Sequence, residues 1–156
     1  MINQEDIKKI KQAAEEFFKK TTFEVLNIEA DFSVAENNDI VNLKIKMADP
    51  QVLIGEAGQT LVEIQRILRL LFNKRLQKFF YLNFDINDYK EKKTEYLKKT
   101  ARDLADEVAF AKEEKKMLPM TAFERRIIHS ELSKRTDVLT ESQGDGRERH
   151  VVIKPR

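Results

Sequence analysis

The stretch Val52-Leu53-Ile54-Gly55-Glu56-Ala57-Gly58-Gln59-Thr60-Leu61 decides how the first half of this 156-residue chain folds. It holds two of the chain's four glycines, and glycine serves where backbone turns sharply or comes close to another group. The pattern predicts a short helix that starts at Asp49-Pro50, a G-x-x-G loop, and a longer helix over residues 59–77. On its own, such a loop is more often a tight corner between two helices than a ligand site.

The segments around this loop have clear periodicities. Residues 3–20 have apolar side chains at helical spacing, whereas residues 23–34 and 40–47 alternate between apolar and polar. The alternation slips by one position near Asn27, which predicts a bulge, and Asn37-Asn38-Asp39 predicts a turn between the two strands. Residues 79–86 alternate again and predict a third strand. The helix over 59–77 is apolar around most of its circumference, so we expect it to be covered on more than one side.

The second half of the chain predicts a long helix followed by a small sheet. A charged helix over residues 88–115 would be about 42 Å long, with Asp88 and Glu91 as a capping box and a solvated last turn over 112–116. Thr121 and Glu124 predict a second capping box, which opens a helix to about residue 134. Strands over 138–143 and 148–153 flank a hairpin turn at Gly144-Asp145-Gly146. We expect an α+β protein with one domain over 1–86 and another over 87–156.

Composition excludes several classes of protein. Lys and Arg total 29 against 27 Asp and Glu, a net charge of +2, which is too mild for a histone or a basic tail. The chain has no cysteine, no apolar run that could span a membrane and a polar N-terminus, so we expect a cytoplasmic protein without disulfides or a membrane partner. It has only two histidines and no H-E-x-x-H, Walker A or G-x-S-x-G motif. We therefore expect no enzyme activity, no cofactor and no metal site.

The first half resembles a K-homology (KH) domain of the bacterial type II topology, α-β-β-α-α-β. The resemblance covers about residues 4–86, and its signature is the Ile-Gly-x-x-Gly-x-x-Leu run at 54–61. It implies that the loop clamps the backbone of a single nucleic-acid strand. The middle positions of this loop commonly hold Lys or Arg in the family, whereas this chain has a carboxylate there, which weakens the grip on phosphate. The contacts implied by the resemblance are Gly55, Glu56, Ala57, Gly58 and Gln59.

The second half resembles the R-three-H domain, a single-stranded nucleic-acid-binding module. Arg125 and His129 match its naming Arg-x-x-x-His pair, and residues at i and i+4 share a helix face. The resemblance implies an adjacent basic patch. Arg147 and Arg149, two apart on the predicted strand 148–153 and just before it, would share a face and supply that patch. Arginines of this kind neutralise phosphates and position a strand without reading its sequence.

A KH domain followed directly by an R-three-H domain is the arrangement of the Jag family, also called SpoIIIJ-associated or KhpB proteins. Many members carry an N-terminal Jag domain, which we expect this chain to lack. The resemblance implies binding of single-stranded RNA, or of single-stranded DNA, by a protein without catalysis. The alternative is a protein–protein adaptor or dimerising module with weak or lost RNA binding. That alternative implies a homodimer, or a heterodimer with a small KH protein.

Overall fold

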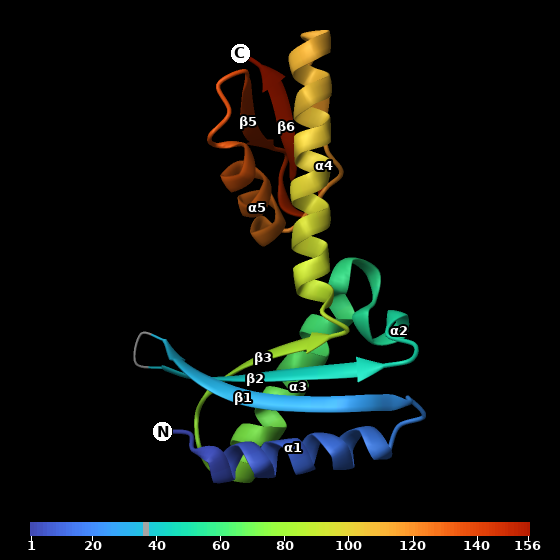
Figure 1. Cartoon of the computed structure of the whole chain (residues 1–156), viewed down its shortest axis with the longest axis vertical. Coiled ribbons are helices and arrows are strands. Elements are labelled where there is room, and N and C mark those ends of the chain that lie inside the picture. The colour runs from blue at the N-terminus through green and yellow to red at the C-terminus, as the bar shows by residue number, and fades with distance from the viewer. Residues whose placement is uncertain (36–37) are drawn as a thin grey trace. The chain divides into compact units, whose positions relative to one another are not determined.

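The computed structural model describes residues 1–35 and 38–156, so Asn37 of the predicted turn lies outside the described residues. The chain divides into two compact units, Met1–Tyr89 and Lys90–Arg156, which Figure 1 shows in colour along the chain. Within the described ranges, no helix combines the length and the apolar character that crossing a membrane requires.

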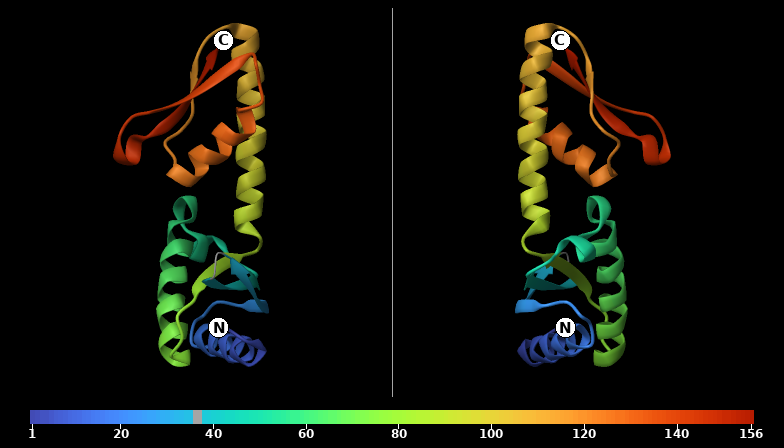
Figure 2. Two further views of the ribbon diagram at one scale, coloured as in Figure 1. Left: turned by 90° about the vertical axis from the view of Figure 1, so that its left-hand side faces the viewer. Right: turned by 90° about the vertical axis from the view of Figure 1, so that its right-hand side faces the viewer.

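The first unit has the element order expected for a type II KH domain. A three-stranded sheet has the order β1-β2-β3, with β1 and β2 antiparallel and β2 and β3 parallel. Helices α1 and α3 share one core with the sheet, as the views in Figure 2 also show. The elements are α1 (Gln4–Lys19), β1 (Val25–Ala35), β2 (Asn38–Met47), α2 (Gln51–Ile54), the 3-10 turn η1 (Glu56–Gly58), α3 (Gln59–Leu76) and β3 (Tyr81–Ile86).

The period-2 pattern of the strands sets which face is buried. The alternate apolar residues of β2 point into the core and are at most 3% exposed: Val41, Leu43, Ile45 and Met47. The predicted irregularity in β1 is confirmed, because the register against β2 shifts between Val25 and Asn27. The short helix α2 starts one residue later than expected, with Pro50 rather than Asp49 at the cap position.

Helix α3 runs along the outer edge of β3. The Gln65 side chain accepts a hydrogen bond from the Phe84 backbone N–H at 3.1 Å, and Asn73 donates to the Phe80 carbonyl at 3.5 Å. These bonds occupy backbone groups on the side of β3 that faces away from β2.

The prediction that α3 is covered on more than one side is wrong. Its buried residues Leu61, Leu68 and Phe72 form one face. Several other apolar side chains of the helix face outward, because neither the sheet nor α1 reaches around to them. They are 41–65% exposed: Val62, Ile67, Leu70 and Leu71.

The second unit packs two helices on a small antiparallel sheet of order β4-β6-β5. Its core joins residues of α4 and α5 to residues of β5 and β6: Leu97, Ala101, Ala105, Val108, Ile128, Leu132, Val138, Val151 and Ile153. The elements are α4 (Tyr89–Ala111), β4 (Lys115–Lys116), α5 (Ala122–Leu132), β5 (Val138–Gln143), the 3-10 turn η2 (Gly146–Glu148) and β6 (His150–Pro155).

Both ends of α4 differ from the prediction. Asp88 has a left-handed φ of 56°, whereas an N-cap residue has extended backbone, so it does not take the predicted place in a capping box with Glu91. At the other end Lys112 has a φ of 59°, which ends the helix. Within the segment predicted as a solvated last turn, Lys115 and Lys116 instead pair with β6 as strand β4.

Candidate nucleic-acid interface

The glycines of the G-x-x-G loop are required by the packing of the first unit itself. Gly55 and Gly58 have positive φ values of 71° and 84°, which side-chain-bearing residues rarely adopt. A Cβ atom at Gly55 would lie 2.0 Å from the Thr60 hydroxyl oxygen, and one at Gly58 would lie 2.9 Å from the Tyr89 ring. Both glycines therefore have a structural reason that does not depend on any ligand.

The loop also uses some of its own hydrogen-bond donors. The Gly58 N–H donates to the Gly55 carbonyl at 3.3 Å, and the Gln59 N–H donates to the Glu56 carbonyl. The side chains of Glu56, Ala57 and Gln59 are exposed. The loop thus presents a carboxylate to solvent, and two of its amides are already bonded within it.

Arg125 lies in the first turn of α5. The predicted capping box at the start of this helix is confirmed, since Thr121 accepts from the Glu124 N–H and Glu124 accepts from the Thr121 N–H. The Arg125 guanidinium is half-buried and donates to the Met120 carbonyl at 3.0 Å. Arg125 therefore braces the segment that enters α5.

His129 connects α5 to β5. Its Nδ1 lies 2.7 Å from the Thr140 hydroxyl and its Nε2 lies 2.8 Å from the Ser142 hydroxyl. Burial of the ring, and then the positive charge of Arg125, lower the pKa of His129 below its ordinary value. The imidazole is therefore neutral near pH 7, with one nitrogen donating and the other accepting. It positions two elements, and it does not supply a positive charge for a phosphate.

The prediction that Arg147 and Arg149 share a strand face is wrong. Arg147 lies in η2, and Arg149 lies between η2 and the start of β6. Gly144 has a φ of 80°, and a Cβ there would lie 2.9 Å from the Glu148 carbonyl, so the chain curls back on itself before the strand begins. Both arginines are exposed, and neither has a carboxylate partner among the residues that the structure describes.

The structure brings three of the predicted residues of the second unit together. The Met120 N–H donates to the Arg149 carbonyl at 3.1 Å, and the Met120 carbonyl accepts from Arg125. His129 lies one helical turn further along α5. The predicted contacts in the glycine loop belong to the first unit.

Sequence reasoning missed the two hydroxyls that hold His129. Thr140 and Ser142 stand two apart on β5 and therefore on one face of the strand. That spacing was visible in the sequence, but the register between α5 and β5 was not.

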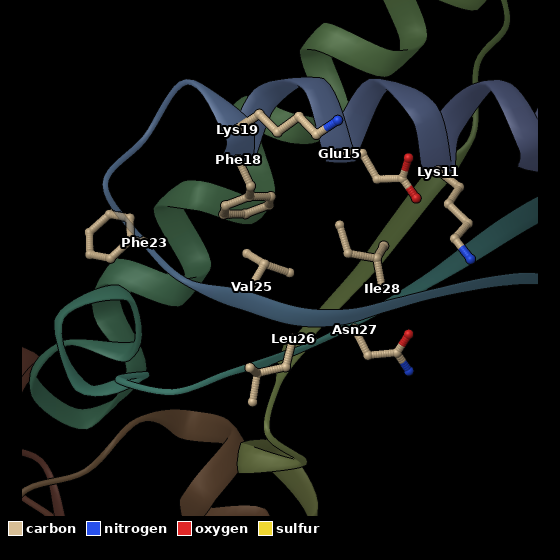
Figure 3. A pocket seen from close by; sticks show the side chains of 9 residues that line it. All are labelled: Lys11, Glu15, Phe18, Lys19, Phe23, Val25, Leu26, Asn27 and Ile28. Carbon is tan, nitrogen blue, oxygen red and sulfur yellow. The ribbon is translucent and has the colours of Figure 1, made fainter.

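Two further observations bear on whether a metal ion or a small molecule binds this chain. Within residues 1–35 and 38–156, no three His, Cys, Asp or Glu side chains are grouped so that they could hold a metal ion. A hollow of about 310 Å³ lies between α1 and the start of β1, as Figure 3 shows. It contains none of the predicted site residues. Its lining is apolar apart from Lys11, Glu15, Lys19 and Asn27.

Comparisons with known proteins support the second unit and the chain as a whole. The R-three-H domain model matches residues 95–155. The RNA-binding protein KhpB of Clostridium symbiosum is 34% identical over 138 residues, which cover 87% of this chain and 62% of that protein. KhpB of Streptococcus pneumoniae D39 is 32% identical over 146 residues, 92% of this chain and 44% of that protein.

The chain thus spans less than two thirds of the length of these two relatives. A third relative, the RNA-binding protein KhpB of Bacillus subtilis 168, is 32% identical over 151 residues. That match covers 96% of this chain and 72% of the relative. With its R-three-H domain and this coverage, the chain belongs to the KhpB family.

Proposed function

We propose that this chain binds single-stranded RNA, without catalysis, through the arginines that flank the start of β6. The observation that carries this proposal is the pair of exposed guanidiniums of Arg147 and Arg149, which have no carboxylate partner among the described residues. Guanidinium groups bind phosphate oxygens and fix the register of a strand without reading its bases. The names of the relatives, which are RNA-binding proteins, agree with this chemistry.

In this proposal the Arg-x-x-x-His pair positions the arginines. His129 holds α5 against β5 through Thr140 and Ser142. Arg125 then holds Met120, whose N–H fixes the backbone of Arg149. The pair named in the domain is therefore the frame of the site, and the phosphate contacts lie beside it.

The first unit supplies a second, weaker contact. We assign a KH domain to residues 1–86 and an R-three-H domain to residues 87–156, and two modules on one chain raise the effective concentration of the second contact. The contact is the exposed edge of the loop over Gly55–Gln59. Glu56 opposes it, because a carboxylate repels phosphate.

Fluorescence anisotropy of a labelled single-stranded RNA, titrated at several salt concentrations, tests the main contact. Combining Arg147→Ala and Arg149→Ala should weaken binding roughly tenfold and flatten the log–log salt slope by about one unit. His129→Gln, which keeps hydrogen-bonding capacity, should leave the slope unchanged because the imidazole carries no charge near pH 7. A wild-type Kd above ~100 μM would rule out the proposal. Unlabelled single-stranded DNA as competitor distinguishes RNA from DNA preference.

A charge reversal tests the loop of the first unit. Glu56→Lys should strengthen RNA binding by about tenfold, because repulsion of a phosphate becomes attraction. Glu56→Gln, which removes the charge alone, should give a smaller gain. Equal Kd values for all three proteins would show that this loop does not approach the strand.

A second candidate function is protein pairing through α3. The outward face of this helix carries apolar side chains that are 41–65% exposed: Val62, Ile67, Leu70 and Leu71. Such a face is typical of an interaction surface, and it suits a second KH-type chain, either a copy of this one or a smaller one. Sedimentation velocity tests self-association. A wild-type dimer that Leu70→Glu converts to monomer would support pairing, and a monomer at every concentration would exclude the homodimer.

A further inference from the structure

A second face of α5 lines a hollow in the second unit. Side chains at the i, i+3, i+4 and i+7 positions of this helix, together with one residue of α4, surround a volume of about 300 Å³. This face is not the one that carries Arg125 and His129, whose side chains reach Met120 and β5. The lining residues are Lys98, Phe123, Arg126, Ile127, Ser130 and Glu131.

The hollow contains an exposed aromatic ring above a partly buried aliphatic floor. Phe123 is 67% exposed, and Ile127, one turn further along α5, packs against the core. A single exposed apolar residue is ordinary on a protein surface. Here the ring borders a concave site of the smallest size that ligand pockets have, so one of its faces is available to a flat partner.

The charge that this hollow offers is positive. Glu131 is paired with Arg102 at 2.5 Å, and Lys98 is paired with Glu95 at 3.0 Å. Arg126, three residues from Phe123 on the same helix face, is exposed and has no carboxylate partner in the described part of the chain. A ligand that enters the hollow therefore meets an aromatic face next to an unpaired guanidinium.

We propose that this hollow binds one base of single-stranded RNA, which stacks on Phe123 while Arg126 contacts the adjoining phosphate. Aromatic rings bind unstacked bases of any sequence, and guanidiniums beside them hold the backbone. The positive charge favours RNA over an apolar protein segment as the occupant. The inference rests on the proposed function and adds a base contact to a site that otherwise touches phosphates alone.

The absence of tryptophan in the chain allows a direct test. Phe123→Trp introduces a sole indole, whose emission should be quenched when a base of unlabelled RNA stacks on it. Phe110→Trp is the matched control, because Phe110 is also on the second unit's surface at 93% exposure and lines no part of the hollow. Its emission should change little on adding RNA.

Affinity measurements complete the test. Phe123→Ala should weaken binding about fivefold or more, and Phe123→Tyr should retain it. An abasic strand of the same length should bind wild type and Phe123→Ala alike, while Arg126→Ala should weaken binding to both strands.

The outcomes separate the two proposals. If wild type binds RNA but Phe123→Ala binds equally well and neither tryptophan is quenched, the base site is overturned and the proposed function stands. If wild type binds no RNA, both are overturned. If the emission of Phe123→Trp changes with protein concentration in the absence of RNA, the hollow is a contact between protein copies, and the base site is again overturned.

Discussion

His129 links the chemistry of one side chain to the stability of the second unit. Burial and the charge of Arg125 lower its pKa in the folded protein, whereas the unfolded chain keeps the ordinary value of about 6.5. The contribution of His129 to stability is therefore fully present above about pH 6.5, and it is lost as the pH falls from there through the folded-state pKa. Urea denaturation of wild type and His129→Gln at pH 7.5 and 5.5 measures this, and the variant should lose less stability on acidification. Parallel losses would contradict the assignment.

Gly58 allows a second prediction at the residue scale. Gly58→Ala should lower the free energy of unfolding by about 1–2 kcal/mol for the left-handed backbone, and by more because the new Cβ would press on the Tyr89 ring at 2.9 Å. The control is Gly146→Ala, where φ is also positive at 54° but nothing lies within 4 Å of the added atom. Urea unfolding should give the larger loss for Gly58→Ala, and equal losses would show that the Tyr89 contact is immaterial.

The sequence located important residues better than it explained them. The scarcity of glycine singled out Gly55 and Gly58, but the groups that require them, Thr60 and Tyr89, became visible only in the folded unit. The Arg-x-x-x-His spacing likewise placed Arg125 and His129 on one helix. Their partners depend on the register between α5 and its neighbours, which no local pattern encodes.

At the scale of elements, the capping box of α5 is expected to stabilise the second unit. Thr121→Ala should lower the free energy of unfolding by about 1 kcal/mol, because the Glu124 N–H loses its acceptor. Thr121→Ser keeps the hydroxyl and should lose much less. Thermal or urea unfolding compares the three proteins. An alanine variant as stable as wild type would mean that water replaces the cap at no loss.

Strands were predicted more accurately than helix ends. The alternation over residues 40–47 and 79–86 reported directly on burial, because one face of the sheet meets the core and the other does not. The end of α4 was misplaced because Lys112, which adopts a left-handed φ there, is an ordinary helix former. The exposed face of α3 was misjudged because apolar composition does not say whether a covering element exists.

For the whole molecule, the net charge of +2 predicts modest salt dependence of RNA binding. The exposed guanidiniums assigned to the strand are those of Arg126, Arg147 and Arg149. Each phosphate neutralised on a single strand contributes about −0.7 to the log–log slope, which predicts a slope of about −2. Anisotropy titrations between roughly 50 and 400 mM KCl measure it. A slope steeper than about −4 would mean that further lysines or arginines contact the RNA.

The two edges of the sheet in the first unit bear on how the protein behaves at high concentration. An uncovered strand edge is a template on which another chain can add, which leads to aggregation and fibrils. Gln65 and Asn73 of α3 occupy backbone groups on the β3 edge. The opposite edge, β1, is irregular between Val25 and Asn27 and carries the exposed carboxylate of Glu29 next to that bulge. The same side chains that look incidental to RNA binding thus keep a sheet of only three strands from growing beyond its own chain.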